Sequence, residues 1–375
     1  MKVRNQEAVT DPHKAERIRL TEEAIVDRIT DRILSYNPKA RGAKKPRSVE
    51  LFSGAGGLAL GVERAGFAHV ALVERDGDAC ATLRANRPEW PVYEMDTRRM
   101  DFRQFKGVEL LAAGAPCQPF SLGGKHQAHA DDRDMFPEVL RVVRETTPEV
   151  IVVENVRGLL RRTFRDYFDY ILRQLANPTI TRKAGETWRQ HAARLPGEWT
   201  GDGLGYAVEW QLVNCADYGV PQARSRVFIV AYRADLGVRW RPLPPTHAKA
   251  RRTVADALKG LPEPTTKGSP DIDNHVLNPG ARSYAGHTGS PLDCPAKTLK
   301  AGDHGCPGGE NMMRRPNGTV RYFTVREAAR IQTFPDDYRF SGAWGECLRQ
   351  IGNAVPVEMG QRIVAEAWKL RCAAR

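Results

Sequence analysis

The chain has 375 residues, of which 41% are hydrophobic and 27% are charged, a balance typical of a soluble globular protein with a large core. Its 7 cysteines form no C-x-x-C pair, so the sequence indicates neither a disulfide framework nor a zinc cluster, and it favours a reducing compartment. The N-terminus lacks the apolar core of a signal peptide and no apolar run reaches membrane-spanning length, so we expect a cytoplasmic protein without membrane contact.

The net charge of +12 is concentrated in two regions. Residues 1–48 hold 12 Lys and Arg against 7 acids, residues 231–321 hold 14 against 8, and together they supply 11 of the 12 excess charges. Positive regions beside a neutral core favour a polyanionic partner. Taken alone, the charge fits a solvated surface about equally well.

The first segment, residues 1–46, is predicted to be a helical extension that ends in a basic linker. Thr21 can cap a helix over residues 22–36, whose apolar stripe consists of Ile25, Ile29 and Ile33. The basic residues that follow, 39–47, suit a flexible tether somewhat better than a phosphate-contacting arm or a localisation signal.

The second segment, residues 47–232, alternates strand-like and helix-like patterns, which is typical of an α/β fold with a doubly wound, mostly parallel sheet. A later pair of patterns, 207–214 and 227–232, could close that sheet with antiparallel strands. Residues 177–205 are rich in Gly, Pro and Trp and are interpreted as a surface insertion. The clearest strands are predicted over 48–52, 68–74, 108–113 and 149–154.

The third segment, residues 233–321, is rich in Pro, Gly and Arg and shows no sustained periodicity, so it predicts a small irregular domain. Residues 322–375 return to regular structure, with helices predicted over 325–332 and 357–371. We expect this last segment to rejoin the domain that contains the sheet.

A glycine-rich loop, Phe52–Gly57, follows the first predicted strand and precedes a helix predicted over 58–65. Glycines let the backbone approach a ligand closely, and the helix N-terminus points amide groups at it. Glu74, at the end of the second strand, suits the hydroxyls of a ribose. Residues 54–59 also fit the dinucleotide form GxGxxG/A, so a NAD-linked oxidoreductase stays an alternative, as does a plain strand-to-helix turn.

Cys117 lies between Pro116 and Gln118-Pro119, directly after the predicted strand 108–113. A free cysteine is more often a small buried hydrophobe than a catalyst. Here the prolines stiffen the backbone on both sides and Gly114 permits a tight exit from the strand, which favours a presented nucleophile.

Polar residues follow two further strands. Glu154 ends the apolar run 150–153, where a carboxylate is costly unless it is used or paired, so a functional role and a structural salt bridge are about equally supported. Alternation before the strand at Val227 would place Gln222, Arg224 and Arg226 on one face. Those donors suit a phosphate or a polar base edge, and a solvated edge strand is the ordinary alternative.

With these motifs in this order, the chain resembles the DNA (cytosine-5)-methyltransferases. The resemblance covers about residues 48–232 and 322–370, and it includes a closing stretch of Gly352, Asn353, Ala354, Val355 and Pro356. It implies a Rossmann-like, S-adenosylmethionine-dependent fold, a catalytic and cofactor-binding domain over 47–232, and a target-recognition domain over 233–321. The motifs that carry it are Phe52–Gly57, Gly114–Ser121, Glu154–Val156, Gln222–Arg226 and Gln350–Pro356.

The resemblance also implies the chemistry of the catalytic residues. The Cys117 thiolate would attack carbon 6 of a flipped-out cytosine, making carbon 5 nucleophilic toward the methyl group. Glu154 would hold and protonate the ring at N3, and Arg226 would contact the base carbonyl. Arg224 and Ser121 would steady the catalytic loop and nearby phosphates, and Gln222 would contact DNA.

For the cofactor, S-adenosylmethionine, the resemblance implies a pocket built from the motif residues. Glu74 would bind the ribose, and Arg75 departs from the bulky apolar residue that often follows this acid. No metal is expected, because the histidines lack ligand spacing. The other cofactor residues would be Phe52 on the adenine, Gly54 and Gly56 near the methionine portion, Asp96 at the adenine edge, and Pro116, Asn353 and Val355 around the rest.

The implied partner is double-stranded DNA, read in the major groove by residues 233–321. The resemblance also implies a role in restriction-modification or in epigenetic marking, with a cognate restriction endonuclease as a candidate partner. We expect a monomer that associates with the nucleoid when it is bound to DNA. An RNA methyltransferase, a dehydrogenase and an inactive nucleic-acid-binding module are the alternatives. The intact Cys117, Glu154 and Arg226 argue against loss of activity.

Overall fold

The structure, a computed structural model, describes residues 44–116, 134–301 and 311–374. By its internal contacts the chain divides into residues 1–41 and residues 42–375, and every described residue belongs to the second unit. The predicted N-terminal helix over 22–36 and two predicted site residues, Cys117 and Ser121, therefore lie outside the described residues.

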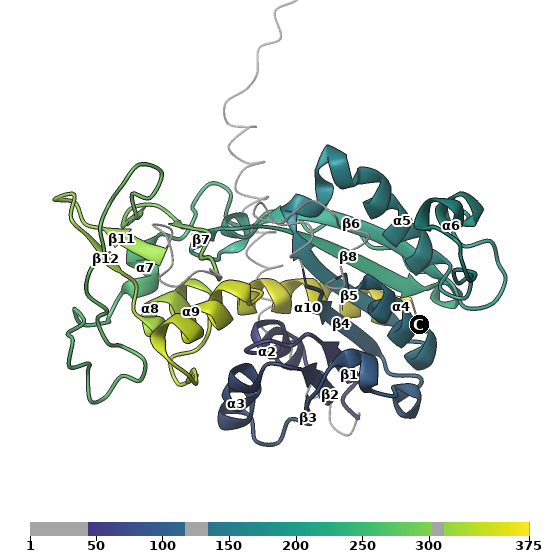
Figure 1. Ribbon diagram of the computed structural model, residues 1–375, viewed down its shortest axis with the longest axis horizontal. Coiled ribbons are helices and arrows are strands. Elements are labelled where there is room, and N and C mark those ends of the chain that lie inside the picture. Colours follow the sequence, from purple (N-terminus) through teal and green to yellow (C-terminus); the bar gives the residue numbers. More distant parts are fainter. Residues whose placement is uncertain (1–43, 117–133, 302–310, 375) are drawn as a thin grey trace, which may run out of the picture. The chain divides into compact units, whose positions relative to one another are not determined.

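A seven-stranded sheet forms the centre of this unit, in the order β3-β2-β1-β4-β5-β8-β6 (Figure 1). The first five strands pair in parallel, and β8 runs antiparallel to both of its neighbours. The doubly wound, mostly parallel α/β fold is thereby confirmed, including its antiparallel closing pair. The strands are β1 (Arg47–Leu51), β2 (Ala68–Glu74), β3 (Val92–Glu94), β4 (Leu110–Gly114), β5 (Val150–Val156), β6 (Tyr206–Asn214) and β8 (Ser225–Arg233).

Most predicted strand boundaries differ from the structure by one or two residues, and one strand of the central sheet was missed. The short edge strand β3 was not predicted, because three residues that include a charged glutamate give no apolar run. Val108 is fully buried but precedes β4, which begins at Leu110.

Helices cover both faces of the sheet, as apolar strands buried on two sides require. Successive residues of β4 and β5 point to opposite faces of the sheet. On one face, Leu111 and Ile151 pack with α4 (Phe136–Thr146) and α5 (Arg165–Ala176). Leu110 and Val150 pack with α2 (Gly57–Arg64) and α10 (Val357–Ala373). Figure 1 shows α10, in yellow, running across β4 and β5.

Two glycines permit the close packing of α2 on the C-terminal segment. A Cβ at Gly57 would lie 2.2 Å from the Val355 carbonyl oxygen, and one at Gly61 would lie 2.6 Å from the Gln361 nitrogen. The C-terminal segment thereby packs directly against α2, the helix that follows the glycine-rich loop.

Residues 233–321 contain only short elements among the described positions, and a third apolar cluster joins them to α8 and α9. Helix α9 was not predicted, although its apolar residues Cys347, Leu348 and Ile351 form one buried stripe. The remaining elements are α3 (Gly77–Asn86), α6 (Trp188–Arg194), α7 (Val254–Leu258), α8 (Val325–Ile331), α9 (Trp344–Asn353), β7 (Gln222–Ala223), β9 (Ser290–Pro291), β10 (Ala296–Lys297), β11 (Met312–Arg314) and β12 (Val320–Tyr322). Among the described helices, none is both long and apolar enough to cross a membrane.

Candidate active site

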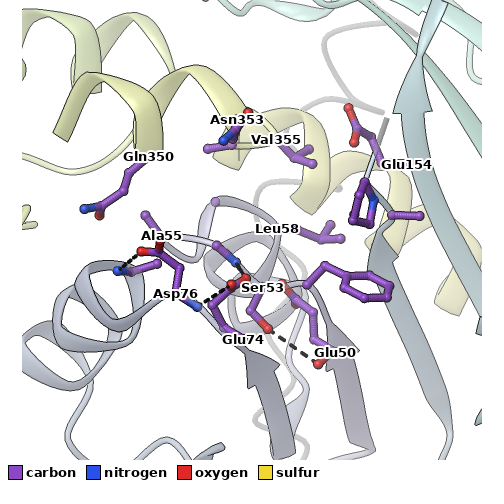
Figure 2. A pocket seen from close by; sticks show the side chains of 18 of the residues that line it. Glu50, Ser53, Ala55, Leu58, Glu74, Asp76, Glu154, Gln350, Asn353 and Val355 are labelled. Atoms are coloured by element: carbon purple, nitrogen blue, oxygen red, sulfur yellow. Dashed lines mark hydrogen bonds between the residues drawn. The ribbon is translucent and has the colours of Figure 1, made fainter. Parts of the chain in front are cut away.

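A pocket of about 320 Å³ lies at the carboxyl ends of the parallel strands, where open α/β sheets bind their ligands. Figure 2 shows Glu74 and Glu154 on different sides of it, with Asn353 and Val355 contributed by the C-terminal segment. Gly56 and Gln222 do not line the pocket. The sequence-predicted residues that do are Phe52, Gly54, Glu74, Asp96, Pro116, Glu154, Arg224, Arg226, Asn353 and Val355.

The glycine-rich loop makes a sharp turn into α2. Phe52 has a φ of 57°, which is uncommon for a residue with a side chain, and Gly54 and Gly56 have φ values of 51° and 85°. A Cβ at Gly56 would lie 2.7 Å from Leu83 Cδ2 and 2.9 Å from the Tyr338 hydroxyl. Gly56 is therefore a packing position that lets the loop turn, while Gly54 faces the pocket.

Glu74 is fastened at the end of β2 by three backbone amides. Its Oε2 accepts from Gly54 N at 2.8 Å, and its Oε1 accepts from Arg75 N at 2.8 Å and Asp76 N at 2.9 Å. These bonds set the carboxylate beside the glycine-rich loop, where it suits a hydroxyl-bearing ligand.

Asp96, after β3, forms a bidentate pair with Arg98, with the shortest contact at 2.6 Å. The hydrogen bonds from the Arg98 guanidinium lower the pKa of Asp96 to about 2. The pocket thus has a permanently charged carboxylate at this rim.

Glu50 in β1 also lines the pocket, and the sequence reasoning missed it. Its side chain is buried, only 1% exposed, and its Oε2 has no hydrogen-bond partner among the described residues. Burial raises the pKa of Glu50 well above its usual value, although a backbone hydrogen bond at Ala59 partly opposes this. The sequence pattern that could have identified Glu50 is the same as at Glu154, namely a carboxylate inside an apolar strand.

Glu154 and Arg226 form a buried ion pair, with Arg226 Nε 2.7 Å from Glu154 Oε1. In the antiparallel register Arg226 stands opposite Val156, so the two charged side chains are diagonal neighbours on one face. Asn155 Nδ2 donates to the Ala115 carbonyl at 3.4 Å and ties the end of β5 to the chain that leaves β4. The structure therefore brings together two predicted catalytic residues that are 72 positions apart.

Gln222 and Arg224 do not share an exposed face with Arg226, contrary to the sequence interpretation. Gln222 belongs to β7, outside the central sheet, and both side chains are fully buried. Arg224 donates to the carbonyls of Leu299, Gly352 and Ala354 at 3.0, 2.7 and 3.1 Å. Gln222 donates to Gln332 Oε1 and accepts from Leu299 N.

Two further lining residues, Arg349 and Gln350, come from α9 and were not assigned from the sequence. Arg349 Nη2 lies 2.6 Å from Asp76 Oδ2, and Gln350 Oε1 accepts from Thr82 Oγ1 at 2.8 Å. Both bonds join the C-terminal segment to α3 and its cap. No group of three or more metal-ligating side chains occurs in the part of the chain that the structure describes.

Comparison with known proteins shows to which family the chain belongs. A model of the family of C-5 cytosine-specific DNA methylases matches residues 47–178 and 200–369. The chain belongs to the C-5 cytosine-specific DNA methylases. It is accordingly a DNA cytosine-5 methyltransferase that uses S-adenosylmethionine.

Relatives of this methylase are similar to it in sequence over most of its length. Type II methyltransferase M.NgoMIV of Neisseria gonorrhoeae is 37% identical over 84% of this chain and 95% of its own length. Type II methyltransferase M.Eco47II of Escherichia coli is 35% identical over 83% of this chain and 76% of its own length. Among solved structures, the Entamoeba histolytica methyltransferase EhMeth superposes with a TM-score of 0.61 at 16% identity, covering 87% of this chain and 99% of its own, which shows the shared fold.

The pocket of this methylase fits its cationic cofactor. Within the described part of the chain the buried Glu50 Oε2 has no hydrogen-bond partner, and a positive charge beside it would offset the cost of burying that oxygen. The volume of about 320 Å³ lies within the range of small-molecule sites.

Proposed function

We propose that one pocket holds both substrates of the methylase, with S-adenosylmethionine along the β1 and β2 ends and the flipped-out cytosine beside Glu154 and Arg226. One observation carries this proposal: the glycine-rich loop with Glu74, and the Glu154–Arg226 pair, line the same cavity. The cofactor supplies an electrophilic methyl group. Phe52, Gly54, Glu74, Asp96, Pro116, Asn353 and Val355 are proposed to hold it.

The chain's own residues would act on the cytosine in four stages. The Cys117 thiolate adds to carbon 6, and the electron pair of the 5,6 double bond moves toward the ring while Glu154 hydrogen-bonds or protonates N3. Carbon 5 then takes the methyl group. A water molecule takes the carbon 5 proton, the double bond re-forms and the thiolate leaves, and N3 returns any proton to Glu154, so Cys117 and Glu154 are regenerated.

The Glu154–Arg226 pair supports these roles electrostatically. The neighbouring guanidinium offsets the cost of keeping Glu154 buried, and Arg226 retains further N–H donors for the base carbonyl. For Arg224 and Gln222 we propose positioning in place of contact with phosphate, because their hydrogen bonds join residues 222–224 to Leu299 and to the Gly352–Ala354 stretch of the pocket wall.

Residues 233–321 are proposed to recognise a specific sequence in duplex DNA, with Ser121 near the target-strand phosphates. The relatives named Type II methyltransferases support a role in restriction and modification. A cognate endonuclease, a monomeric state and binding at the nucleoid are parts of this proposal.

Bisulfite sequencing of plasmid DNA from cells that express the methylase tests the proposal, since it reports activity and sequence context together. We expect one methylated sequence with wild type and none with Cys117→Ala, which should still bind DNA. Tritium transfer from labelled cofactor to duplex DNA and to tRNA is the companion measurement. Transfer to RNA alone, or substantial turnover by Cys117→Ala, would contradict the proposed function.

A further inference from the structure

Residues 179–199 lie between the two stretches that the family model matches; most of them are exposed, and a few of their side chains pack against the core of this methylase. His191 is buried, and Ile180, Trp188 and Leu195 join the apolar cluster on the α4 and α5 face. A capping box of Thr187 and Gln190 starts α6. The mostly exposed segment fits the interpretation of 177–205 as a surface insertion, and a few buried or half-buried side chains anchor it to the core.

A hydrogen-bonded aromatic cluster fastens α6 to α5. His191 lies between the Tyr170 hydroxyl and the Ile180 carbonyl oxygen, each at 2.8 Å. Burial lowers the pKa of His191, so the ring is neutral; Nε2 must carry the proton for the carbonyl, and Tyr170 donates to Nδ1. The Trp188 ring packs edge-on against Tyr167, with centroids 5.4 Å apart.

Tyr167 connects this cluster to the start of α4. Its hydroxyl donates to Asp134 Oδ2, and Asp134 Oδ1 accepts from Phe136 N at 3.1 Å. Burial and the nearby Asp134 raise the pKa of Tyr167 far above its usual value, so the phenol stays a donor. Asp134 is thus held from both sides, by a helix N-terminus and by a buried phenol.

Met135, the residue between these two contacts, lines the active-site pocket. It is only 9% exposed, and Pro116 and Glu154 belong to the same pocket. A shift of Asp134 therefore moves a side chain of the pocket wall, and the contacts form a continuous path from Trp188 through Tyr167 and Asp134 to Met135.

We propose that Tyr167 and Asp134 brace the active site as positioning residues that hold Met135 in place for methyl transfer, with the Trp188 ring packed against Tyr167. This inference rests on the proposed function, in that it takes the pocket as the site of methyl transfer. Its chemistry is steric: the brace keeps the pocket wall in the geometry that the reacting groups need.

The test compares Tyr167→Phe with Tyr170→Phe. Both variants keep a ring in the same cluster and lose one hydroxyl, but only the first loses the bond to Asp134. We expect Tyr167→Phe to lower the single-turnover rate of methyl transfer about tenfold, while the dissociation constant of S-adenosylmethionine changes less than about twofold. Tyr170→Phe should lower thermal stability similarly and leave that rate nearly unchanged.

Substitutions at Asp134 supply the rescue control. Asp134→Asn keeps one accepting oxygen but places an N–H donor where the other oxygen accepts, so it should restore the rate only in part, whereas Asp134→Ala should match Tyr167→Phe. The double variant Tyr167→Phe/Asp134→Ala should be no slower than either single variant. Equal rate losses in Tyr167→Phe and Tyr170→Phe, or an unchanged rate in Tyr167→Phe, would overturn the brace.

An NMR measurement that does not depend on methyl transfer distinguishes failure of the brace from failure of the proposed function. With ¹³C-methyl-methionine labelling and assignment by Met135→Leu, the Met135 methyl signal should shift in Tyr167→Phe and Asp134→Ala and stay in place in Tyr170→Phe. An unmoved signal in all variants contradicts the brace even if wild type is active. Absence of DNA methylation by wild type, with the expected signal shifts, contradicts the proposed function alone.

Discussion

The two ends of the pocket are built in different ways. At the cofactor end, the glycine-rich loop and Glu74 follow neighbouring strands β1 and β2, and backbone amides within 20 positions fasten the carboxylate. At the target-base end, Glu154 meets Arg226 across an antiparallel pair, and Arg224 reaches carbonyls near residue 353, about 130 positions away. Local contacts hold the Glu74 carboxylate at the proposed cofactor end, and long-range contacts hold Glu154 and Arg224 at the proposed base end, so substitutions at the two ends should affect different measurements.

Glu154→Gln is expected to give the largest effect. It removes the acid at N3 and leaves the buried Arg226 without its charge partner, so methyl transfer should slow by about 10²- to 10⁴-fold. S-adenosylmethionine affinity, measured by calorimetry, should change little. Glu74→Gln is the matched control and should show the reverse, with weaker cofactor binding and a largely preserved rate at saturating cofactor. Equal losses of rate and affinity in Glu154→Gln would remove the distinction between the two ends.

Arg224→Met should destabilise the protein more than any other single change at the base end that leaves Glu154 intact. The carbonyls of Leu299, Gly352 and Ala354 would lose their buried donor, at a cost of about 3 kcal/mol in the free energy of unfolding. Urea denaturation measures this. Arg103→Met, which removes an exposed arginine paired with Asp101, should leave the free energy of unfolding nearly unchanged. Similar costs for both would contradict a positioning role for Arg224.

Glu50→Gln tests the cofactor end through pH. The carboxyl has a raised pKa in the folded protein, so below its ordinary value of 4.5 it is neutral in both states. As the pH rises above 4.5, the unfolded state ionises first and wild type loses stability, by up to about 1.4 kcal/mol per pH unit until the folded carboxyl ionises. The Gln variant should lack this loss in denaturation series at several pH values, and it should bind S-adenosylmethionine more weakly. Parallel pH profiles for the two proteins would show that Glu50 is not the group responsible.

Arg98→Gln should give the smallest effect. Without the guanidinium, the pKa of Asp96 should return from about 2 toward its ordinary 3.8, which a carboxylate NMR titration can follow. Because the pair is partly exposed, the free energy of unfolding should change by less than about 0.5 kcal/mol. A pKa that stays near 2 would mean that another group, such as the Arg98 backbone amide, dominates.

Much of the fold was predictable because its strands are apolar runs that end in glycine or a polar residue. Ser48 to Phe52 and Val150 to Val153 indicated buried parallel strands, and the alternation in Ala207 to Asn214 indicated the antiparallel pair. The residues of the proposed cofactor end could be predicted from these strands, because the glycine-rich loop follows β1 and Glu74 is the last residue of β2. Short elements with few apolar residues, such as β3, lacked that signal.

The base end was less predictable, because a residue's role there depends on which distant segment it meets. Arg224 carries the same guanidinium as Arg226, and the Gln222 amide also offers N–H donors, but both side chains pack against Gln332, Leu299 and Gly352 and are fully buried. The importance of Tyr167 likewise depends on Asp134, 33 positions earlier, which no periodicity connects to it.

The sequence by itself determined the α/β class and the order of the motifs, and it predicted the reacting groups, because apolar periodicity and residue chemistry act locally. Only the tertiary structure decided which of the described groups meet, that Glu50 lines the pocket, and that Tyr167 contacts the residue next to Met135 in its wall. Strand order and register bring distant residues to within hydrogen-bonding distance, and those contacts are a property of the packed chain as a whole.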